Sequence, residues 1–258
     1  MRLSIWSLPL LSGAILIAIW YAAIAVFDIP HYTLPTPGAI LGAIVEKRHL
    51  LFPALAQTGW AALLGFLLAL FGGFTIAVIL AGSKILKRAL YPWVLTLQMV
   101  PVIVLIPIFV IWFGPGLPSI MAITFMISFF PIVANTTLGL VSTDQGLLDL
   151  FDTYGATKWQ EIAKLRLPYA LPHFLTGVKI AATLAPIGAI TGDLLAGTSA
   201  GTSGLGYLLL QFRAGFYPPG IYAIAFLSAL LGFAFVATVQ LIYWLLLHRW
   251  HESSNRNQ

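Results

Sequence analysis

Asp193 and the glycine-rich segment after it are the features of this sequence that most suggest chemistry. Asp193 is the only acid in an apolar run that is not plainly near an end of that run. The segment 197–206 is rich in glycine and hydroxyl groups, as phosphate loops are, but it lacks the Gly-Lys-Ser/Thr that brings a lysine and a hydroxyl to phosphate and Mg²⁺. Leu209 also stands where a dinucleotide fingerprint has its third glycine. The sequence therefore encodes no ATP site of its own.

The remaining reactive side chains do not predict an enzyme. Cysteine is absent, so the chain has no disulfide framework and no cysteine nucleophile. The histidines lie at the ends of apolar runs or between them, and only the last two are spaced as a ligand pair would be: His31, His49, His173, His248 and His251. We expect no metal site and no cofactor on this chain, and any ATP and Mg²⁺ must bind a separate ATPase.

The composition predicts an all-α membrane protein. Hydrophobic residues make up 60% of the chain and charged residues 8%, with a mean hydropathy of +0.95, whereas a soluble domain has about 25% charged residues. A spanning helix needs about 20 apolar residues, and six runs qualify; they are continuously apolar, unlike the strands of a membrane barrel. The runs cover approximately residues 5–27, 57–82, 92–113, 119–141, 174–198 and 220–247.

Positive charge orients these six predicted helices. With both termini inside, only Lys47, Arg48 and Arg213 fall outside, and the other ten of the 13 Lys and Arg residues, Lys179 included, fall on or near the cytoplasmic side. This bias is typical of an inserted protein, so the net charge of +5 reflects topology rather than nucleic-acid binding. The first run exceeds the roughly 7–15 residues of a signal-peptide core, and we expect it to remain as a helix.

The segments between the runs differ in character. An extended, proline-containing connector from residue 29 leads into a short amphipathic stretch that ends near His49. Residues 83–91 are predicted to form a short basic inner loop, and residues 114–118 a tight outer turn. The outer segment 197–219 is rich in Gly and Ser.

The longest polar interval, residues 142–172, predicts two short helices. An apolar stripe at helical spacing marks the first helix. It consists of Leu147, Leu148, Phe151 and Tyr154. Asp144 suits the N-terminus of this helix, Gly155 can adopt the left-handed conformation that ends it, and a second helix from about Lys158 is expected to stop at Pro168. By composition alone, an amphipathic hairpin lying on anionic lipid would be favoured.

Three polar residues fall at membrane depth. Asp193 either lines a transport pathway as a gate or solute contact, or lies near the outer interface where it caps a helix or meets water. Gln98 and Asn135 either contact solute or join helices by hydrogen bonds, which is the commoner role. Pro101 and Pro107 predict a kink in the third span.

The interval 142–172 resembles the cytoplasmic "EAA loop" of ABC-importer permeases. The family pattern is Glu-Ala-Ala, three residues, Gly, nine residues, then Ile-x-Leu-Pro. In this chain larger apolar residues replace both alanines, leucine replaces isoleucine, and the glycine and the Leu-Pro end match. The corresponding positions are Asp149, Leu150, Phe151, Gly155, Ala156, Leu165, Leu167 and Pro168.

Further segments are similar to the nitrate, sulfonate, taurine and bicarbonate branch of these permeases, which includes relatives for pyrimidine precursors of thiamine. They are Leu34-Pro35-Thr36-Pro37, Ile111-Trp112-Phe113-Gly114, Phe130-Pro131-Ile132, Asn135-Thr136 and Gly204-Leu205-Gly206-Tyr207. The resemblance covers roughly residues 30–247. It implies a type I ABC permease fold with six transmembrane helices and a coupling-helix hairpin.

The resemblance also implies partners and roles. Two permeases, expected to be identical, would assemble in the bacterial inner membrane with two cytoplasmic ATPases, which hold ATP and Mg²⁺, and an external solute-binding protein. The motif residues from Asp149 to Pro168 would contact the ATPase, while Gln98, Asn135 and Asp193 would lie on the pathway. Residues 1–55 would form a first helix and external connector, 56–247 the permease core, and 248–258 a cytoplasmic tail with both termini inside.

The identity of the solute stays open at this point. Because no Arg or Lys is expected at mid-membrane to pair with an oxyanion, a neutral or weakly basic molecule such as a hydroxymethylpyrimidine is favoured. The alternative function is a stand-alone secondary transporter or channel that uses Asp193, although such proteins often contain two related halves and none is evident. A structural membrane subunit would also fit the composition.

Overall fold

The computed structural model describes residues 7–196 and 203–251, and the regular elements within them are helices. In chain order they are α1 (Ser7–Val26), α2 (Pro37–Glu46), α3 (Arg48–Gly82), α4 (Lys84–Leu97), α5 (Val102–Phe113), α6 (Leu117–Val141), α7 (Gln145–Thr153), α8 (Lys158–Glu161), a π turn η1 (Ile162–Arg166), α9 (Leu167–Ala196), α10 (Leu205–Ala214) and α11 (Pro218–His251).

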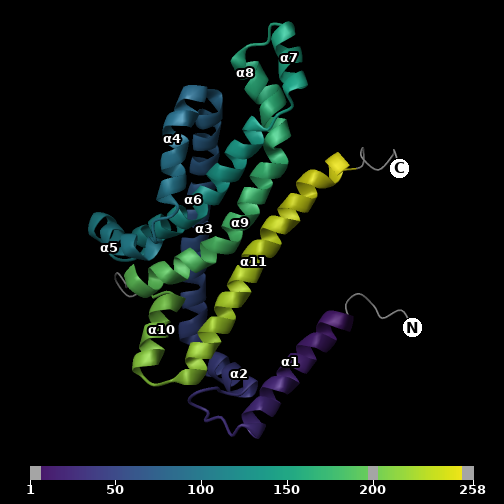
Figure 1. The fold of residues 1–258 in the computed structure, drawn as a ribbon. Helices are drawn as coiled ribbons and strands as arrows, with labels where there is room; N and C mark the ends of the chain where they lie inside the picture. The colour runs from purple at the N-terminus through teal and green to yellow at the C-terminus, as the bar shows by residue number, and fades with distance from the viewer. Residues whose placement is uncertain (1–6, 197–202, 252–258) are drawn as a thin grey trace.

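Helices α3, α6 and α9 make the packed centre of the molecule, and α11 lies along it (Figure 1). Small residues allow the backbones to approach closely, as is typical inside membranes. A Cβ atom at Gly65 of α3 would lie 2.8 Å from the Met121 carbonyl oxygen of α6, and one at Gly177 of α9 would lie 2.8 Å from the Pro131 carbonyl oxygen. The three helices are therefore fixed in depth relative to one another.

The structure supports a multi-pass membrane protein but changes the boundaries of the expected spans. Four helical stretches are long and apolar enough to cross a membrane, and a bent pair makes a fifth if it counts as one span. The four stretches are Arg48–Gly82, Leu117–Val141, Lys158–Ala196 and Pro218–Leu245. The apolar part of α1 that the structure describes, Leu11–Val26, is shorter than these.

The third expected span, residues 92–113, is not a single straight helix. The chain there forms two helices, Ile85–Leu97 and Val102–Phe113, bent by 98°. Pro101 lies at the break and caps α5 in an extended conformation; it has no N–H to donate, and it disfavours helix in the residue before it. The kink predicted at Pro101 is confirmed, whereas Pro107 lies within α5 without breaking it.

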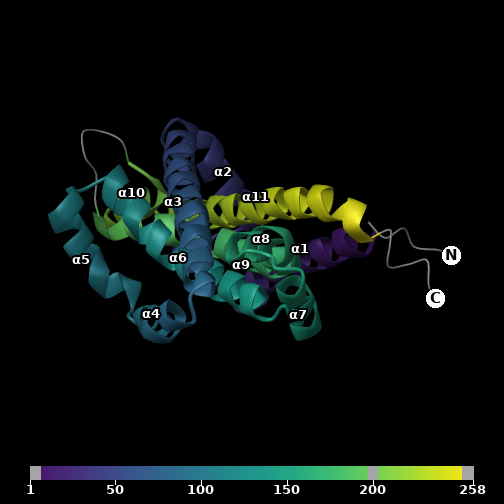
Figure 2. The same cartoon turned by 90° about the horizontal axis from the view of Figure 1, so that it is seen from above.

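The expected basic loop at residues 83–91 is also wrong, because α4 begins at Lys84. Ser83 caps this helix, its hydroxyl accepting a hydrogen bond from the Leu86 N–H at 3.3 Å. In Figure 2, α4 and α5 lie on one flank of the bundle, while α1 and α11 extend toward the opposite flank. Part of the glycine-rich outer segment, residues 197–202, lies outside the described residues, and the rest contains helix α10.

The end of the bundle near α2 is held by contacts between distant segments. The Tyr217 hydroxyl donates to the Glu46 carboxylate at 3.2 Å, and the Lys47 ammonium lies 2.7 Å from the same carboxylate. The hydrogen bond and charge of Lys47 lower the pKa of Glu46. The Tyr222 hydroxyl donates to the Thr33 carbonyl oxygen at 2.9 Å. These contacts fasten the connector after α1 to the start of α11.

We expect Gly65→Ala to lower the free energy of unfolding by about 1–3 kcal/mol, the usual cost of overpacking. The added Cβ would press on the α6 backbone at Met121. Gly72→Ala on the same helix is the matched control, because its nearest neighbour would be the Phe125 ring at 3.4 Å, an ordinary contact. Thermal unfolding midpoints of both variants in detergent check this, and equal midpoints would contradict the close approach at Gly65.

Candidate functional site

Helices α7 and α8 form a hairpin that stands beyond one end of the α3–α6–α9 bundle (Figure 1). The Asp144 carboxylate caps α7 by accepting the Leu147 N–H at 3.2 Å. Gly155 ends the turn after α7 with φ +67°, a conformation that favours glycine, and its N–H donates to the Asp152 carbonyl oxygen at 2.9 Å. The predicted turn at Gly155 and the predicted start of the second helix near Lys158 are both confirmed.

A capping box starts α8. The Gln160 N–H donates to the Thr157 hydroxyl at 3.3 Å, and the Thr157 N–H donates to the Gln160 side-chain oxygen at 2.8 Å. The predicted stop at Leu167-Pro168 is wrong, because helix continues from Lys158 to Ala196. The Leu167 N–H donates to the Ile162 carbonyl oxygen in the π turn. Pro168 has no N–H to donate, and this wider turn tolerates the missing hydrogen bond.

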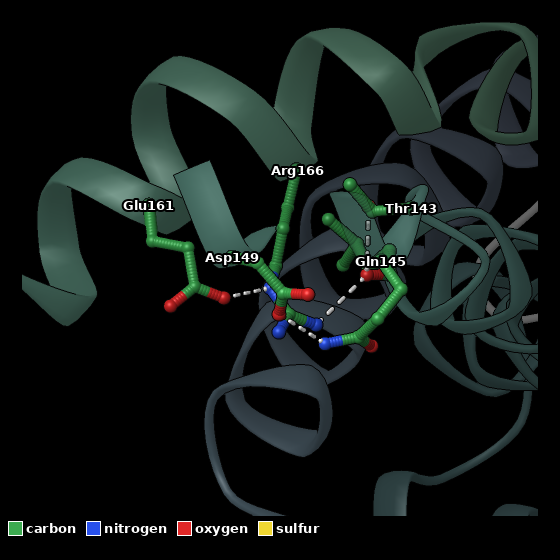
Figure 3. Close-up of polar contacts among 6 residues, drawn as sticks. Thr143, Gln145, Asp149, Glu161 and Arg166 are labelled. Atoms are coloured by element: carbon green, nitrogen blue, oxygen red, sulfur yellow. Dashed lines mark hydrogen bonds and ion pairs between the residues drawn. The ribbon is translucent and has the colours of Figure 1, made fainter. Parts of the chain in front are cut away.

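Arg166 fixes the base of the hairpin (Figure 3). Its Nε donates to the Glu161 carboxylate at 2.5 Å, and its Nη1 donates to the Leu140 carbonyl oxygen at the end of α6 at 3.2 Å. The Thr143 hydroxyl donates to the same carbonyl oxygen at 3.4 Å. This anchor was not predicted, because Glu161 and Arg166 are five positions apart, whereas a regular α-helix pairs residues three or four positions apart.

The hairpin exposes an apolar surface that its own chain leaves uncovered. None of the residues of α7 is buried, and Tyr154 is 83% exposed. Trp159 of α8 is 70% exposed, and Leu147 and Leu150 are also exposed. We name this the hairpin face: Leu147, Leu150, Tyr154 and Trp159. A soluble surface seldom presents such a set unless it meets a partner or lipid.

The residues at the motif positions are distributed along the hairpin and the start of α9. Asp149 is exposed and accepts a hydrogen bond from the Gln145 amide at 2.8 Å (Figure 3). Gly155 and Pro168 are also exposed. The others are half-buried: Phe151, Ala156, Leu165 and Leu167. The motif positions therefore offer one acid, Asp149, and several apolar groups.

The three predicted pathway residues lie on different helices. Gln98 is exposed at the end of α4, where the chain bends. Asn135 is half-buried in α6, and its amide donates to the Pro131 carbonyl oxygen of its own helix at 2.8 Å. Asp193 is 2% exposed in the last turns of α9 and accepts the Thr58 hydroxyl at 2.6 Å. The structure therefore does not gather these residues into one cluster.

Lys179, which is expected on or near the cytoplasmic side, lies beside the middle of α6. Its neighbours in α9 pack against the middle of α6: Gly177 faces Pro131, and the Ser128 hydroxyl lies 3.5 Å from the Ala181 carbonyl oxygen. The Lys179 side chain is exposed, with its ammonium 5.9 Å from the Tyr243 ring centre.

A groove of about 480 Å³ between α9 and α11 begins one turn beyond Lys179. Its lining includes the hydroxyl residues Thr183 and Ser228 among apolar side chains. No group of three His, Cys, Asp or Glu residues that could hold a metal ion occurs within residues 7–196 and 203–251.

Comparison with known proteins agrees with this arrangement. The family model described as "Binding-protein-dependent transport system inner membrane component" matches residues 69–251. The chain is 36% identical to the formylaminopyrimidine transport permease protein ThiX of Halalkalibacterium halodurans, across 90% of this chain and 91% of that protein. It is 32% identical to the riboflavin transport system permease protein RibX of Chloroflexus aurantiacus, across 93% and 88%.

Two further comparisons concern other solutes and the fold. The chain is 30% identical to the putative aliphatic sulfonates transport permease protein SsuC of Bacillus subtilis, across 81% of this chain and 75% of that protein. A solved structure of the MetNI methionine ABC transporter matches with a TM-score of 0.59 and 21% identity, covering 76% of this chain and 98% of that chain. That likeness shows the fold alone.

The resemblance drawn from residues 149–168 is confirmed by these matches. The family model matches residues 69–251, and one relative is 36% identical across nine-tenths of the chain. The fold is also that of an ABC permease. The chain belongs to the family of binding-protein-dependent transport system inner-membrane components, the permeases of ABC importers.

Proposed function

We propose that this permease receives the motion of a cytoplasmic ATPase through the α7–α8 hairpin. The observation that carries the proposal is the hairpin face, an apolar surface standing beyond the bundle with Tyr154 83% exposed. Aromatic side chains of this kind are common anchors of protein interfaces. The exposed Asp149 and the half-buried Phe151 and Ala156 would lie around this anchor, within a groove of the ATPase.

The hairpin is well placed to move the membrane helices. Arg166 joins it to the end of α6, and α9 continues from it as one helical stretch from Lys158 to Ala196. Force applied at Tyr154 would therefore act on α6 and α9 together. The half-buried Leu165 and Leu167 and the exposed Pro168 lie at the joint between hairpin and span.

The assembled importer would contain two copies of this permease, two ATPases that hold ATP and Mg²⁺, and an external binding protein. We count six membrane helices by adding α1 to the four long stretches and the bent α4–α5 pair, with both termini and the hairpin cytoplasmic. Residues 56–247 would form the permease core. Gln98 and Asn135 would belong to the region through which solute passes between the two copies, and Asp193 would lie buried beside that region.

The proposed solute is a small heterocycle related to pyrimidines. The relative with 36% identity is described as a formylaminopyrimidine permease, and the one with 32% identity as a riboflavin permease. Both names denote heterocyclic compounds.

A second candidate is an anionic solute such as an aliphatic sulfonate. The specific observation in its favour is Lys179, an exposed cation beside the middle of α6. Ionisable residues within a span usually face a cavity or pathway, and an ammonium there would attract a sulfonate. A sulfonate permease is also among the relatives, at 30% identity.

We expect Tyr154→Ala to weaken ATPase binding by roughly 10- to 100-fold, the usual effect of removing an aromatic anchor. Co-purification of the ATPase from native membranes, followed by titration of the purified subunits, measures this. Tyr32→Ala is the control, because Tyr32 is 75% exposed at the opposite end of the molecule. Unchanged ATPase affinity together with weakened binding to anionic vesicles would instead assign the hairpin to the lipid surface.

A second pair of variants tests the shape of the hairpin. Gly155→Val should abolish ATPase co-purification, because a β-branched residue is strained at φ +67°. Gly155→Asn should retain most of it, because asparagine tolerates this conformation. No neighbouring atom lies within 4 Å of a Cβ at this position, so steric crowding does not separate the two variants. Equal ATPase binding by both would contradict a role for the turn.

A third test separates the two solute classes. Cells that express the permease with its ATPase and binding protein are assayed for uptake of radiolabelled formylaminopyrimidine and of an aliphatic sulfonate. If the sulfonate is carried, Lys179→Met should reduce its uptake at least 10-fold, and Lys179→Arg should preserve it. Uptake of the pyrimidine alone, unaffected by Lys179→Met, would establish the heterocycle and dismiss the sulfonate.

A further inference from the structure

Asp193 is a buried acid whose contacts join three helices. It lies in α9, is 2% exposed, and its Oδ2 accepts the hydroxyl of Thr58 from α3 at 2.6 Å. Thr58 is fully buried and also accepts the N–H of Leu205, the first residue of α10, at 2.9 Å. The N–H groups of Gly204 and Gly206 donate to the same carboxylate. Thr58 thus shares one hydrogen-bonded cluster with Asp193, 135 positions away in the sequence, and with Leu205, 147 positions away.

These contacts supply the N-terminal cap that α10 lacks. Gly204 occupies the cap position and has no side chain to accept the first N–H groups of the helix. A carboxylate is among the preferred acceptors for such groups, and a negative charge also complements the positive end of the helix dipole. Here that carboxylate comes from α9, and the supporting hydroxyl comes from α3.

The fit around the carboxylate leaves room only for glycine. A Cβ atom at Gly204 would overlap the Asp193 carboxylate itself. A Cβ at Gly206 would lie 2.6 Å from the Leu194 backbone nitrogen, so the first turn of α10 rests directly on α9. Neither contact leaves space for a solute between Asp193 and α10.

Beyond this junction, α10 packs into the end of the bundle opposite the hairpin. Leu205, Leu208 and Phe212 are buried there in a cluster with residues of α2, α3 and α11. In Figure 1, α10 lies where α9 ends, while the hairpin lies at the start of the same helical stretch. One helix therefore has the hairpin at one end and α10 at the other.

We propose that Asp193 and Thr58 are positioning residues that fasten α10 to the end of α9, so that the two helices move as one unit. Asp193 acts on the pathway through α10 and does not contact solute. A displacement of the hairpin would then be transmitted through α9 to α10, which would move by the same amount as the end of α9. This last consequence rests on the proposed function of the hairpin, whereas the fastening itself does not.

Cysteine labelling of the full chain in detergent tests the fastening without knowledge of the solute. The chain has no cysteine, so Leu208→Cys provides a single reporter on the buried side of α10, where Leu208 is 1% exposed. A hydrophilic maleimide should label this reporter at least 10-fold faster when Asp193→Asn or Thr58→Val is present. Thr58→Ser, which keeps the hydroxyl, should restore slow labelling.

Two controls make the outcome decisive. Thr191→Val removes a hydroxyl that bonds only the Ile187 carbonyl of its own helix, and it should leave the labelling rate unchanged. Ile132→Cys, a fully buried reporter in the α3–α6–α9 core, should stay protected in every variant. Slow labelling of Leu208→Cys in both Asp193→Asn and Thr58→Val would overturn the proposal, as would equally fast labelling of Ile132→Cys.

ATPase co-purification separates this proposal from that of the hairpin. Asp193→Asn should leave it unchanged, because Asp193 and the hairpin lie at opposite ends of the same helical stretch. Loss of ATPase binding in Asp193→Asn would contradict a local fastening. Failure of the Tyr154 test would leave the labelling result standing.

Discussion

Backbone contact between α6 and α9 is the interaction on which the rest of the structure depends. A Cβ at Gly188 of α9 would lie 3.0 Å from the Thr124 Cα of α6, and Gly177 faces the Pro131 carbonyl oxygen farther along. In lipid, apolar side chains gain little by leaving their surroundings, so helices associate through close packing. Because α9 is held against α6 at several depths, both of its ends have defined positions.

Those two ends use polar chemistry in different ways. At the hairpin, Arg166 combines a carboxylate with the carbonyl oxygen of Leu140, which satisfies a group that the end of α6 leaves free. At the other end, Asp193 meets the free N–H groups where α10 starts. In both places an ionisable side chain on or beside α9 completes the backbone hydrogen bonding of another helix.

Local signals predicted the parts of the site that local physics determines. Asp144 as a cap and Gly155 as a left-handed turn depend on a few neighbouring residues, and the structure has both. The break at Pro101 could also be predicted from the sequence. Its 98° angle could not, because the angle depends on how α4 and α5 pack.

Other features escaped the sequence analysis because they depend on distant partners. The carbonyl oxygen of Leu140 carries no signal in the sequence, so its bond with Arg166 was missed. The position of Lys179 beside the middle of α6 follows from the packing of α9 against α6, which no local signal in the sequence shows. The helix continues past Pro168 because the wider π turn tolerates the N–H that proline lacks, whereas a proline alone predicts a helix end.

The π turn at Ile162–Arg166 also sets the direction in which the hairpin leaves the bundle. Each residue of an α-helix advances the chain by about 100° around the axis. Deleting one residue from this turn would make the helix regular, yet it would rotate α8 to another side of the α9 axis. The orientation of the hairpin around the α9 axis therefore depends on the number of residues in this turn as well as on their side chains.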